Sequence, residues 1–490
     1  MDFPVLSVIV FTPIVAGLLI LLMPAERKTE VRVTALAAAT FSLLLSIWVY
    51  FSYNASIGGY QFVESYNWLP ALGISYIVGV DGMNAPLVLL TGIVMFTGVM
   101  ISWGIDDRPR EFFAFLFILA SGVFGVFVAQ DLFMLFFFYE IAVFPMYLLI
   151  SIWGWVKTRE YAAMKLTLYL FIGSVVSLIG ALAMYFNSGL NTFNMFELAR
   201  VGFSHDFQVF WFPFVFFGFA VLGGIFPFHN WSPDGHVAAP TAVSMFHAGV
   251  LMKLGAFAAL RVGIMLLPEG AQAWRWLILG LATVNVVYGA FIAMVQTDFK
   301  YVIGFSSVSH MGLVMLGFAT LTQDGLLGAG IQMFSHGVMT ALFFAVVGMV
   351  YDRAHTREIN QLGGFSKKMP WVAVAFIIGG LVSMGMPGLS GFVAEFPIFM
   401  GVWQVQPIVA VIAAISIVIT AAYIIKIIGK VFFGPMSEEF EHHVGDVTAL
   451  DKVALVTLCV IMITVGVYPM VMSPLVASGV QSILSLFGGA

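Results

Sequence analysis

Fourteen long apolar runs dominate this sequence and limit what the chain can fold into. A helix needs about 20 mostly apolar residues to cross the hydrocarbon core of a bilayer, and most of the runs reach that length. Lipid offers no hydrogen bonds to the backbone, which favours helices. The sequence therefore predicts an all-α polytopic membrane protein with about 14 transmembrane helices. The expected spans are 4–23, 32–53, 82–103, 112–128, 131–154, 162–186, 209–229, 241–262, 273–296, 299–322, 325–351, 371–399, 405–433 and 453–476.

The composition supports this class and excludes others. Hydrophobic residues make up 61% of the chain and charged residues 9%, whereas soluble proteins carry about 25% charged residues. Cys459 is the single cysteine, so a disulfide framework or thiolate metal cluster within this chain is excluded. The sequence has no glycine-rich nucleotide motif, and we expect any redox cofactor to sit on a partner.

Basic residues concentrate in alternate loops. The loops after odd-numbered helices hold Arg27, Lys28, Arg32, Arg108, Arg110, Lys157, Arg159, Lys165, Lys300, Arg353, Arg357, Lys367, Lys368, Lys430 and Lys452, and the others hold Arg200, Arg261 and Arg275. Lys and Arg favour cytoplasmic loops. We therefore expect both termini on the non-cytoplasmic side of a bacterial-type inner membrane.

Two runs contain helix breakers. Gly223, Gly224 and Pro227 interrupt the seventh run, and Pro387 interrupts the twelfth. Interrupted helices in corresponding positions of two halves are typical of a transporter-type ion site. We predict two inverted five-helix repeats, helices 4–8 and 9–13, with helices 7 and 12 discontinuous. The expected organisation is 1–110 (helices 1–3), 111–263 (first repeat), 264–434 (second repeat) and 435–490 (a cytoplasmic loop and helix 14).

Three ionisable side chains are expected deep within apolar helices: Glu140, Lys253 and Glu395. A charge at that depth costs ~2.5–3.5 kcal/mol on insertion scales, so such residues usually serve a function. Each also has a structural interpretation. Glu140 could be a protonated or snorkelling acid, Lys253 could cap the broken helix, and Glu395 could be part of a structural salt bridge. A buried lysine whose neighbours change charge is a switchable proton site.

Two histidines, His310 and His336, lie on successive helices between Lys253 and Glu395. Imidazole titrates near physiological pH and can relay protons, although a hydrogen-bonded core histidine is the common alternative. We predict that Glu140, Lys253, His310, His336 and Glu395 form a polar row through the middle of the membrane.

Further polar residues have a supporting role in this prediction. We expect His229, Asp234 and His236, after the first break, to bond freed backbone or connect the row to the cytoplasm rather than to hold a metal. His247 lies six residues before the buried lysine, which places the two about 120° apart on a regular helix. Lys426 is another deep cation, with interfacial snorkelling as the alternative.

Several motifs resemble those of one known family. They are FFFYEIAVFPMYLLISIWG, FPFHNWSPDGHVAAPTAVSMFHAGVLMKLGAFAALRVG, SSVSHMG, SHG and GLSGFVAEF. They are similar to the antiporter-like membrane subunits of respiratory complex I, most closely the subunit M (chain 4) type. The resemblance covers nearly the whole chain. It matches Glu140, Lys253 and Glu395 to the family's helix-5 glutamate, helix-8 lysine and helix-12 acid, and His310 and His336 to its central relay.

One position departs from the family pattern. The family usually carries a lysine in helix 7, five residues before the proline of the break, as the ion-pair partner of the helix-5 glutamate. Leu222 occupies that position here. The resemblance therefore leaves Glu140 without its expected partner. A water, another subunit or Lys253 itself remains as an alternative partner for Glu140.

The resemblance implies a proton-translocating membrane-arm subunit of NADH:quinone oxidoreductase. FMN, iron–sulfur clusters and quinone are then expected on partners, and L-, N-, K-, J- and A-type subunits as neighbours. A membrane-bound hydrogenase, a complex I without the NADH module, or a multisubunit cation/proton antiporter would use a homologous subunit. A third class of function is a scaffold subunit that conducts no ions.

Overall fold

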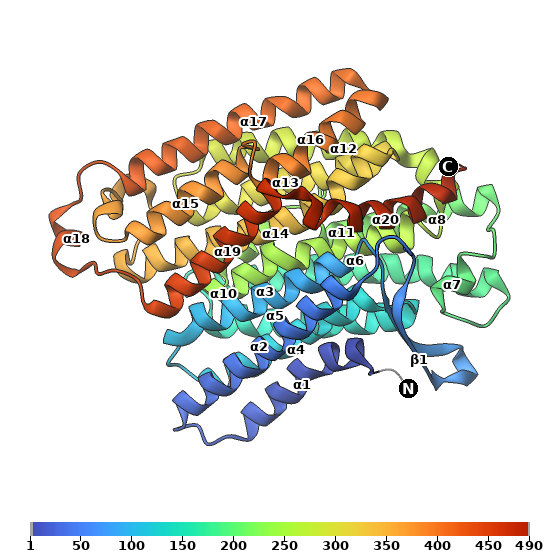
Figure 1. The fold of residues 1–490 in the computed structure, drawn as a ribbon, viewed down its shortest axis with the longest axis horizontal. Helices are drawn as coiled ribbons and strands as arrows, with labels where there is room; N and C mark the ends of the chain where they lie inside the picture. Colours follow the sequence, from blue (N-terminus) through green and yellow to red (C-terminus); the bar gives the residue numbers. More distant parts are fainter. Residues whose placement is uncertain (1–2, 489–490) are drawn as a thin grey trace.

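The computed structural model describes residues 3–488, apart from the side chains at positions 439 and 443, as a bundle of long helices lying side by side (Figure 1). Thirteen helices of this part of the chain are long and apolar enough to cross a membrane. Twelve of them are α1 (Val5–Leu22), α2 (Lys28–Ser52), α3 (Ala85–Ile101), α4 (Pro109–Val128), α5 (Leu132–Trp153), α6 (Arg159–Ser188), α8 (His205–Leu222), α12 (Pro268–Val295), α13 (Phe299–Thr320), α14 (Gln323–Ala354), α17 (Pro407–Ile427) and α19 (Ala449–Val467).

The remaining long helix, Thr241–Ile264, is assembled from four pieces. They are α10 (Thr241–Phe246), a π-helical stretch (His247–Leu251), α11 (Met252–Ala258) and a second π-helical stretch (Ala259–Ile264). π-helical turns are rare and occur often at functional sites. Lys253 lies in the short α-helical segment between them.

Shorter elements complete the chain. The short helices are α7 (Met195–Leu198), α9 (Trp231–Ala238), α15 (Pro370–Ser383), α16 (Ser390–Val405), α18 (Glu438–His443) and α20 (Ser473–Leu484). Single helical turns cover Pro70–Leu72, Ser102–Gly104, Ile359–Gln361, Phe365–Lys367, Ile428–Phe432, Pro469–Val471 and Ser485–Phe487.

The two expected helix breaks are confirmed. In the first, α8 ends at Leu222 and α9 begins at Trp231, so Gly223, Gly224 and Pro227 lie in the irregular segment. In the second, α15 and α16 are separated by a segment that contains Pro387 and two glycines with positive φ, Gly385 (+66°) and Gly388 (+89°). Together α15 and α16 form the twelfth predicted span, but each is too short to be counted as a spanning helix. This is why fourteen runs correspond to thirteen long helices.

The all-α polytopic class is confirmed, but one element was missed and one predicted span was wrong. The missed element is a hairpin in which β1 (Gln61–Leu69) pairs antiparallel with β2 (Ile74–Val80). A search for long apolar runs misses this hairpin, because β1 is short and mostly exposed. The predicted span 453–476 is also not one helix. Pro469 and Pro474 lie where α19 gives way to α20, since proline cannot continue a helix.

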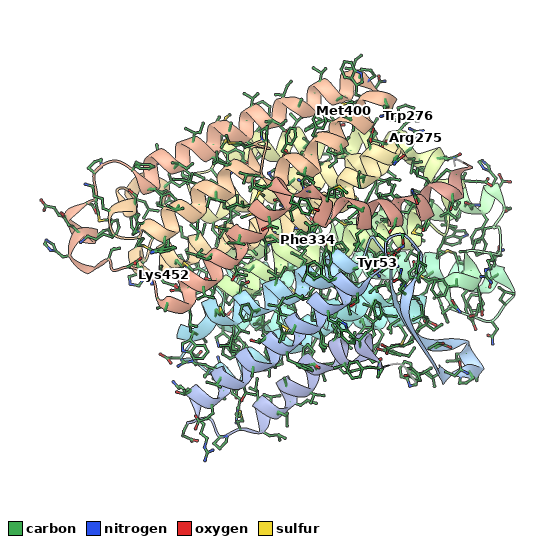
Figure 2. The ribbon with its side chains drawn as sticks, in the orientation of Figure 1. Tyr53, Arg275, Trp276, Phe334, Met400 and Lys452 are labelled. Atoms are coloured by element: carbon green, nitrogen blue, oxygen red, sulfur yellow. The ribbon has the colours of Figure 1, made fainter. Side chains whose placement is uncertain are left out.

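The bundle has two chemically distinct ends. One end, which we call the basic end, is formed by the turns 23–28, 102–109, 154–158, 296–298, 355–369 and 433–448. Arg32 pairs with Asp106 at 2.7 Å there, and Trp153 donates to the Asp107 carbonyl at 2.8 Å. The hairpin and α7 lie at the opposite end, and α18 lies at the basic end (Figure 1). Lys452 marks the basic end, and Phe334 lies near the middle of the bundle (Figure 2).

Burial identifies the centre of the bundle. Helices α14 and Thr241–Ile264 are buried along the whole of their most apolar window, and α13 along 94% of it, whereas α2, α6 and α17 face outward. The three central helices carry Lys253, His310 and His336. The inverted relation of the repeats and the boundaries at 110, 263 and 434 stay predictions.

Candidate functional site

The lysine of the central helix, Lys253, is completely buried. Its Nζ donates a hydrogen bond to the carbonyl of Ala248 in the adjoining π-helical stretch. No carboxylate among the described side chains lies within ion-pair distance of it. A buried cation held only by a carbonyl is poorly compensated, so its proton affinity responds strongly to nearby charge.

Two histidines lie close together here, His247 on the lysine helix itself and His236 on the neighbouring α9. The rings of His236, in α9, and His247 have centroids 4.1 Å apart, and His247 stacks on Trp231 at 5.1 Å. The helix α9, which follows the break, thus packs on the helix that carries Lys253. His236 Nε2 lies 2.9 Å from Ser232 Oγ, whereas neither ring nitrogen of His247 has a partner among the described residues. Buried polar groups without protein partners are usually satisfied by water.

A second polar group surrounds His310 in α13. Its Nδ1 lies 3.1 Å from Glu395 Oε1 and its Nε2 lies 3.0 Å from Ser383 Oγ. Gln332 Nε2 donates to the same oxygen of Glu395 at 3.2 Å. The structure therefore brings His310 and Glu395 together, as the polar row requires. Gln332 and Ser383 were missed, although a glutamine inside an apolar run was a usable signal.

His336 connects the two groups. Its ring stacks on His310 with centroids 5.2 Å apart. It also interacts electrostatically with Lys253 and His236. Neither of its ring nitrogens has a partner within residues 3–488. Ring contacts join His247 to His236 and His336 to His310, and electrostatic interactions with Lys253 connect the two pairs. Lys253, His247, His236, His336 and His310 are therefore treated as one buried set, which ends at Glu395.

The remaining member of the expected row, Glu140, lies apart from this set. Its side chain is exposed on the outer face of α5, and it accepts a hydrogen bond from Ser174 in α6 at 2.8 Å. Phe137 and Phe144 on the same helix are 42% and 64% exposed, so this face of α5 points outward. Within the described residues the predicted row is therefore interrupted between Glu140 and Lys253, because α5 turns Glu140 away from the lysine.

The residue that replaces the family lysine, Leu222, is fully buried. It packs where helix Thr241–Ile264 passes closest to α8, since a Cβ on Gly255 would lie 2.4 Å from the backbone nitrogen of Gly223. No cation of residues 3–488 pairs with Glu140. The partner of Glu140 is therefore missing from this part of the chain, as the sequence indicated.

The polar residues after the first break have different roles. Asp234 pairs with Lys165 at 2.7 Å and accepts a hydrogen bond from Tyr301 at 3.0 Å, which ties α9 to α6 and α13. His229 instead stacks on Phe226 and meets the edge of Tyr288. Neither contacts the buried set, so only His236 of these three extends it.

The broken backbone is satisfied by residues that sequence reasoning missed. Asn285 in α12 donates to the Gly224 carbonyl at 2.8 Å and accepts from the Phe226 N–H. Trp231 Nε1 donates to the Val221 carbonyl at 2.9 Å. Free backbone groups at a break need such partners, because lipid supplies none. Of the two roles expected for His229 and His236, bonding the freed backbone is wrong, and a connection towards the cytoplasm stays a prediction.

Two further cations are accounted for structurally. Lys426 in α17 is half-buried and donates to the Met294 carbonyl at 3.1 Å, which ties α17 to α12. Arg261 forms a buried ion pair with Asp81, after β2, and its guanidinium lies over Tyr60 and Phe257. This pair joins the second π-helical stretch to the start of α3 and was not predicted.

Metal binding has little support in this arrangement. Among the described residues, no three His, Cys, Asp or Glu side chains gather closely enough to hold a metal ion. The lone cysteine, Cys459, is buried in α19 and is a free thiol. The chemistry that the buried set offers is proton binding and release.

Apolar spanning helices, two broken helices and a lysine and histidines buried between them define the class of antiporter-like integral membrane subunits. The family described as "NADH:quinone oxidoreductase/Mrp antiporter, TM" matches residues 129–420. The chain therefore belongs to this family of multi-pass membrane proteins.

Individual proteins of this family resemble the chain over nearly its whole length. NAD(P)H-quinone oxidoreductase chain 4 of Gloeobacter violaceus is 36% identical over 485 residues, which cover 97% of this chain and 91% of that protein. A chain of respiratory complex I from Thermus thermophilus superposes with a TM-score of 0.91 at 27% identity, covering 99% of this chain and 100% of that one. A chain of the Mrp complex from a Dietzia species shares the fold, with a TM-score of 0.87 at 20% identity and coverage of 99% and 100%.

Proposed function

We propose that this chain is a proton-translocating membrane-arm subunit of a complex I-type NAD(P)H:quinone oxidoreductase. The observation that carries the proposal is the buried set Lys253, His247, His236, His336 and His310, which ends at Glu395 on the central helices. The near full-length likeness to chain 4 of such an oxidoreductase supports it.

The energetic requirement is modest. Moving one proton against ~100 mV costs ~2.3 kcal/mol. A change of ~2 units in the proton affinity of one group supplies ~2.7 kcal/mol. Lys253 is fully buried and has no acidic partner within the described residues, so a charge that moves nearby acts on it with little screening. Quinone reduction elsewhere in the assembly would drive that charge movement.

The remaining parts of the complex follow from this role. The chain carries no redox centre of its own in this proposal, and FMN, iron–sulfur clusters and quinone belong to other subunits. Its neighbours in the membrane arm are L-, N-, K-, J- and A-type subunits, and it lies in a bacterial plasma membrane. The basic end faces the cytoplasm, which places both termini on the other side.

A second candidate is a homologous subunit of a membrane-bound hydrogenase, of a complex I without the NADH module, or of a multisubunit cation/proton antiporter. The shared fold with the Mrp complex chain supports it. Purifying the complex and identifying its co-migrating subunits separates these assemblies.

The direct test measures protons pumped per electron by the purified complex in sealed vesicles. We expect Lys253→Met to lower this ratio while the complex still assembles and reduces quinone. The Asp324→Asn variant changes a carboxylate that bonds Gln404 at the periphery and serves as control. A normal ratio in Lys253→Met would refute the proposal.

A further inference from the structure

Three consecutive backbone carbonyls between α9 and α10 each accept a hydrogen bond from a different segment of the chain. The donors belong to the loop after α5, the first turn of α13 and the loop after α14. The three bonds are Arg357 Nη1 to Val237 at 2.9 Å, the Trp155 N–H to Ala238 at 2.7 Å, and Lys300 Nζ to Ala239 at 2.6 Å. We call these three hydrogen bonds the three-point clamp.

The clamped turn joins two helices of the buried set. The helix α9, which carries His236, ends at Ala238, and the helix that carries His247 and Lys253 begins at Thr241. The ring centroids of His236 and His247 lie 4.1 Å apart. Because the two histidines lie on opposite sides of the turn in the chain, the distance between their rings depends on the conformation of the turn.

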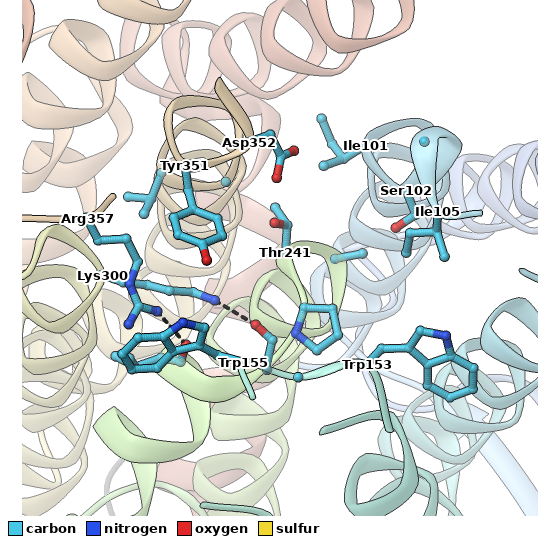
Figure 3. Close-up of a pocket in the computed structure, with 18 of the residues that line it drawn as sticks. Ile101, Ser102, Ile105, Trp153, Trp155, Thr241, Lys300, Tyr351, Asp352 and Arg357 are labelled. Carbon is cyan, nitrogen blue, oxygen red and sulfur yellow. Dashed lines mark hydrogen bonds between the residues drawn. The ribbon is translucent and has the colours of Figure 1, made fainter. Parts of the chain in front are cut away.

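Packing leaves this turn unsupported on one side. Val237 and Ala239 line a cavity of about 580 Å³ at the basic end (Figure 3). Protein interiors are otherwise close-packed, so a segment beside a cavity depends more on its hydrogen bonds for its position. Lys300 and Arg357 reach the turn from neighbouring elements, and the Trp155 ring lies against the Arg357 guanidinium (Figure 3).

Arg357 is the part of the clamp with the most contacts. Besides its bond to the turn, its guanidinium lies 4.0 Å from the Trp155 ring centroid, and its Nη2 lies 3.1 Å from an Asp298 oxygen. Its backbone carbonyl accepts the Phe299 N–H at 2.8 Å. A planar guanidinium can stack on a ring and donate in its own plane at the same time, which an ammonium group cannot do. Arg357 therefore holds both the turn and the Trp155 loop.

The clamp also links the two halves of the buried set. Lys300 lies in the first turn of α13, the helix of His310. Arg357 follows the end of α14, the helix of His336, by three residues. Each of these helices thus extends a cation to the turn that adjoins His236. A displacement at the basic end of α14 would therefore be passed to the turn through Arg357.

We propose that Arg357 is a positioning residue, which fixes the 237–240 turn through the three-point clamp and so holds His236 against His247. The proposal rests on the function proposed above. Arg357 acts through the backbone of the turn and carries no proton itself, since a guanidinium stays protonated in proteins.

The test uses Arg357→Lys in the complete complex. This variant keeps the charge but loses the stacked, forked geometry. We expect amide hydrogen exchange at Trp155 and in residues 236–241 to become roughly tenfold faster, because these groups lose part of the clamp. We expect the number of protons pumped per electron to fall roughly tenfold and its pH profile to shift, because the two imidazoles are displaced from each other. Mass spectrometry of the exchanged complex and pumping in sealed vesicles measure these effects.

Two further variants complete the test. Arg353→Lys makes the same substitution at the same end of α14, where the guanidinium donates to the Met349 carbonyl at 3.0 Å, and should change neither measurement. Trp155→Leu removes the ring but keeps the N–H that bonds Ala238, and should reproduce the effects of Arg357→Lys. In the double variant of Trp155 and Arg357 we expect little further loss, because both single changes break the same contact.

The outcomes separate this proposal from the proposed function. Unchanged exchange at Trp155 in both Arg357→Lys and Trp155→Leu overturns the clamp. Faster exchange with a normal proton-to-electron ratio and an unshifted pH profile overturns the positioning role. Normal pumping in Arg357→Lys together with loss of pumping in Lys253→Met refutes this inference alone, whereas normal pumping in Lys253→Met refutes the proposed function.

Discussion

Glu395 and His310 lie 3.1 Å apart, from Oε1 to Nδ1, and both side chains are buried. The opposite nitrogen of the imidazole is held by Ser383 at 3.0 Å. A proton can pass between the carboxylate and the ring along this contact. Glu395 is therefore the acid placed to exchange a proton directly with His310.

Replacing this acid separates its charge from its shape. Glu395→Gln keeps a side chain of the same size and can still contact Gln332 and His310, so we expect the complex to assemble. We expect proton pumping to fall by roughly tenfold or more, because the amide cannot take up the proton that His310 carries. The ratio of protons to electrons in vesicles measures this. Pumping at the normal ratio would remove Glu395 from the path.

The lysine on the central helix allows a complementary test. Lys253→Met removes a buried cation that bonds only the Ala248 carbonyl, so the thermal stability of the complex should stay equal or rise. Pumping should fall by roughly tenfold or more. Thermal unfolding in detergent and pumping in vesicles are measured on the same preparation. A large loss of stability would show that the lysine is structural.

Introducing a lysine at position 222 tests whether the missing partner of Glu140 can be restored. Gly173, next to Ser174, packs against Val221, next to Leu222, so Leu222 lies at the level of the Ser174–Glu140 hydrogen bond. We predict that the ammonium of Leu222→Lys pairs with the Glu140 carboxylate and that the variant is therefore tolerated.

The control for this pair is Leu222→Lys in a Glu140→Gln background. There the new lysine has no acid to pair with, and a buried unpaired charge should cost about 3–5 kcal/mol. Thermal unfolding of the two single variants and the double variant gives the coupling. Additive effects would show that the two side chains do not meet.

Asp131, the cap of α5, predicts a pH dependence of stability. Its carboxylate accepts hydrogen bonds from the Met134 and Ser75 N–H groups, which joins α5 to the hairpin. Burial nevertheless raises the pKa of Asp131 from 3.8 to about 6. The folded state holds this proton more tightly than the unfolded state, so the contribution to stability is present below pH ~4 and is lost as pH rises through about 6.

The Asp131→Asn variant should lack this dependence. We expect the difference in unfolding temperature between variant and wild type to grow in favour of the variant between pH 4 and pH 7, corresponding to roughly 3 kcal/mol at most. Thermal unfolding in detergent across this range measures it. A constant difference would show that Asp131 stays ionised throughout.

Much of the fold could be predicted because lipid restricts the choices of the chain. Fourteen apolar runs and helix breakers in two of them are local signals, and the helices and the breaks at Pro227 and Pro387 follow from them. The β-hairpin escaped, because strands Gln61–Leu69 and Ile74–Val80 are stabilised by pairing with each other rather than by long apolar runs.

The site was predictable in part, for a geometric reason. Lys253, His310, His336 and Glu395 were found because each is an ionisable residue in an apolar helix. Depth along a helix says nothing about which way a side chain points, and this is why the outward direction of Glu140 was not anticipated. The π-helical stretches around Lys253 also change the angular positions of residues on that helix, which a regular spacing cannot anticipate.

The outward position of Glu140 has a consequence best put in electrical terms. Within the described chain, the buried set ends in an insulated carboxylate, Glu395, whereas the carboxylate of Glu140 is bare and separate from that set. A bare carboxylate facing hydrocarbon is costly, so this site is complete only when another surface closes over it. The isolated chain lacks the surface that covers Glu140. Electrically it is an incomplete unit, so measurements on the chain alone do not describe its working state.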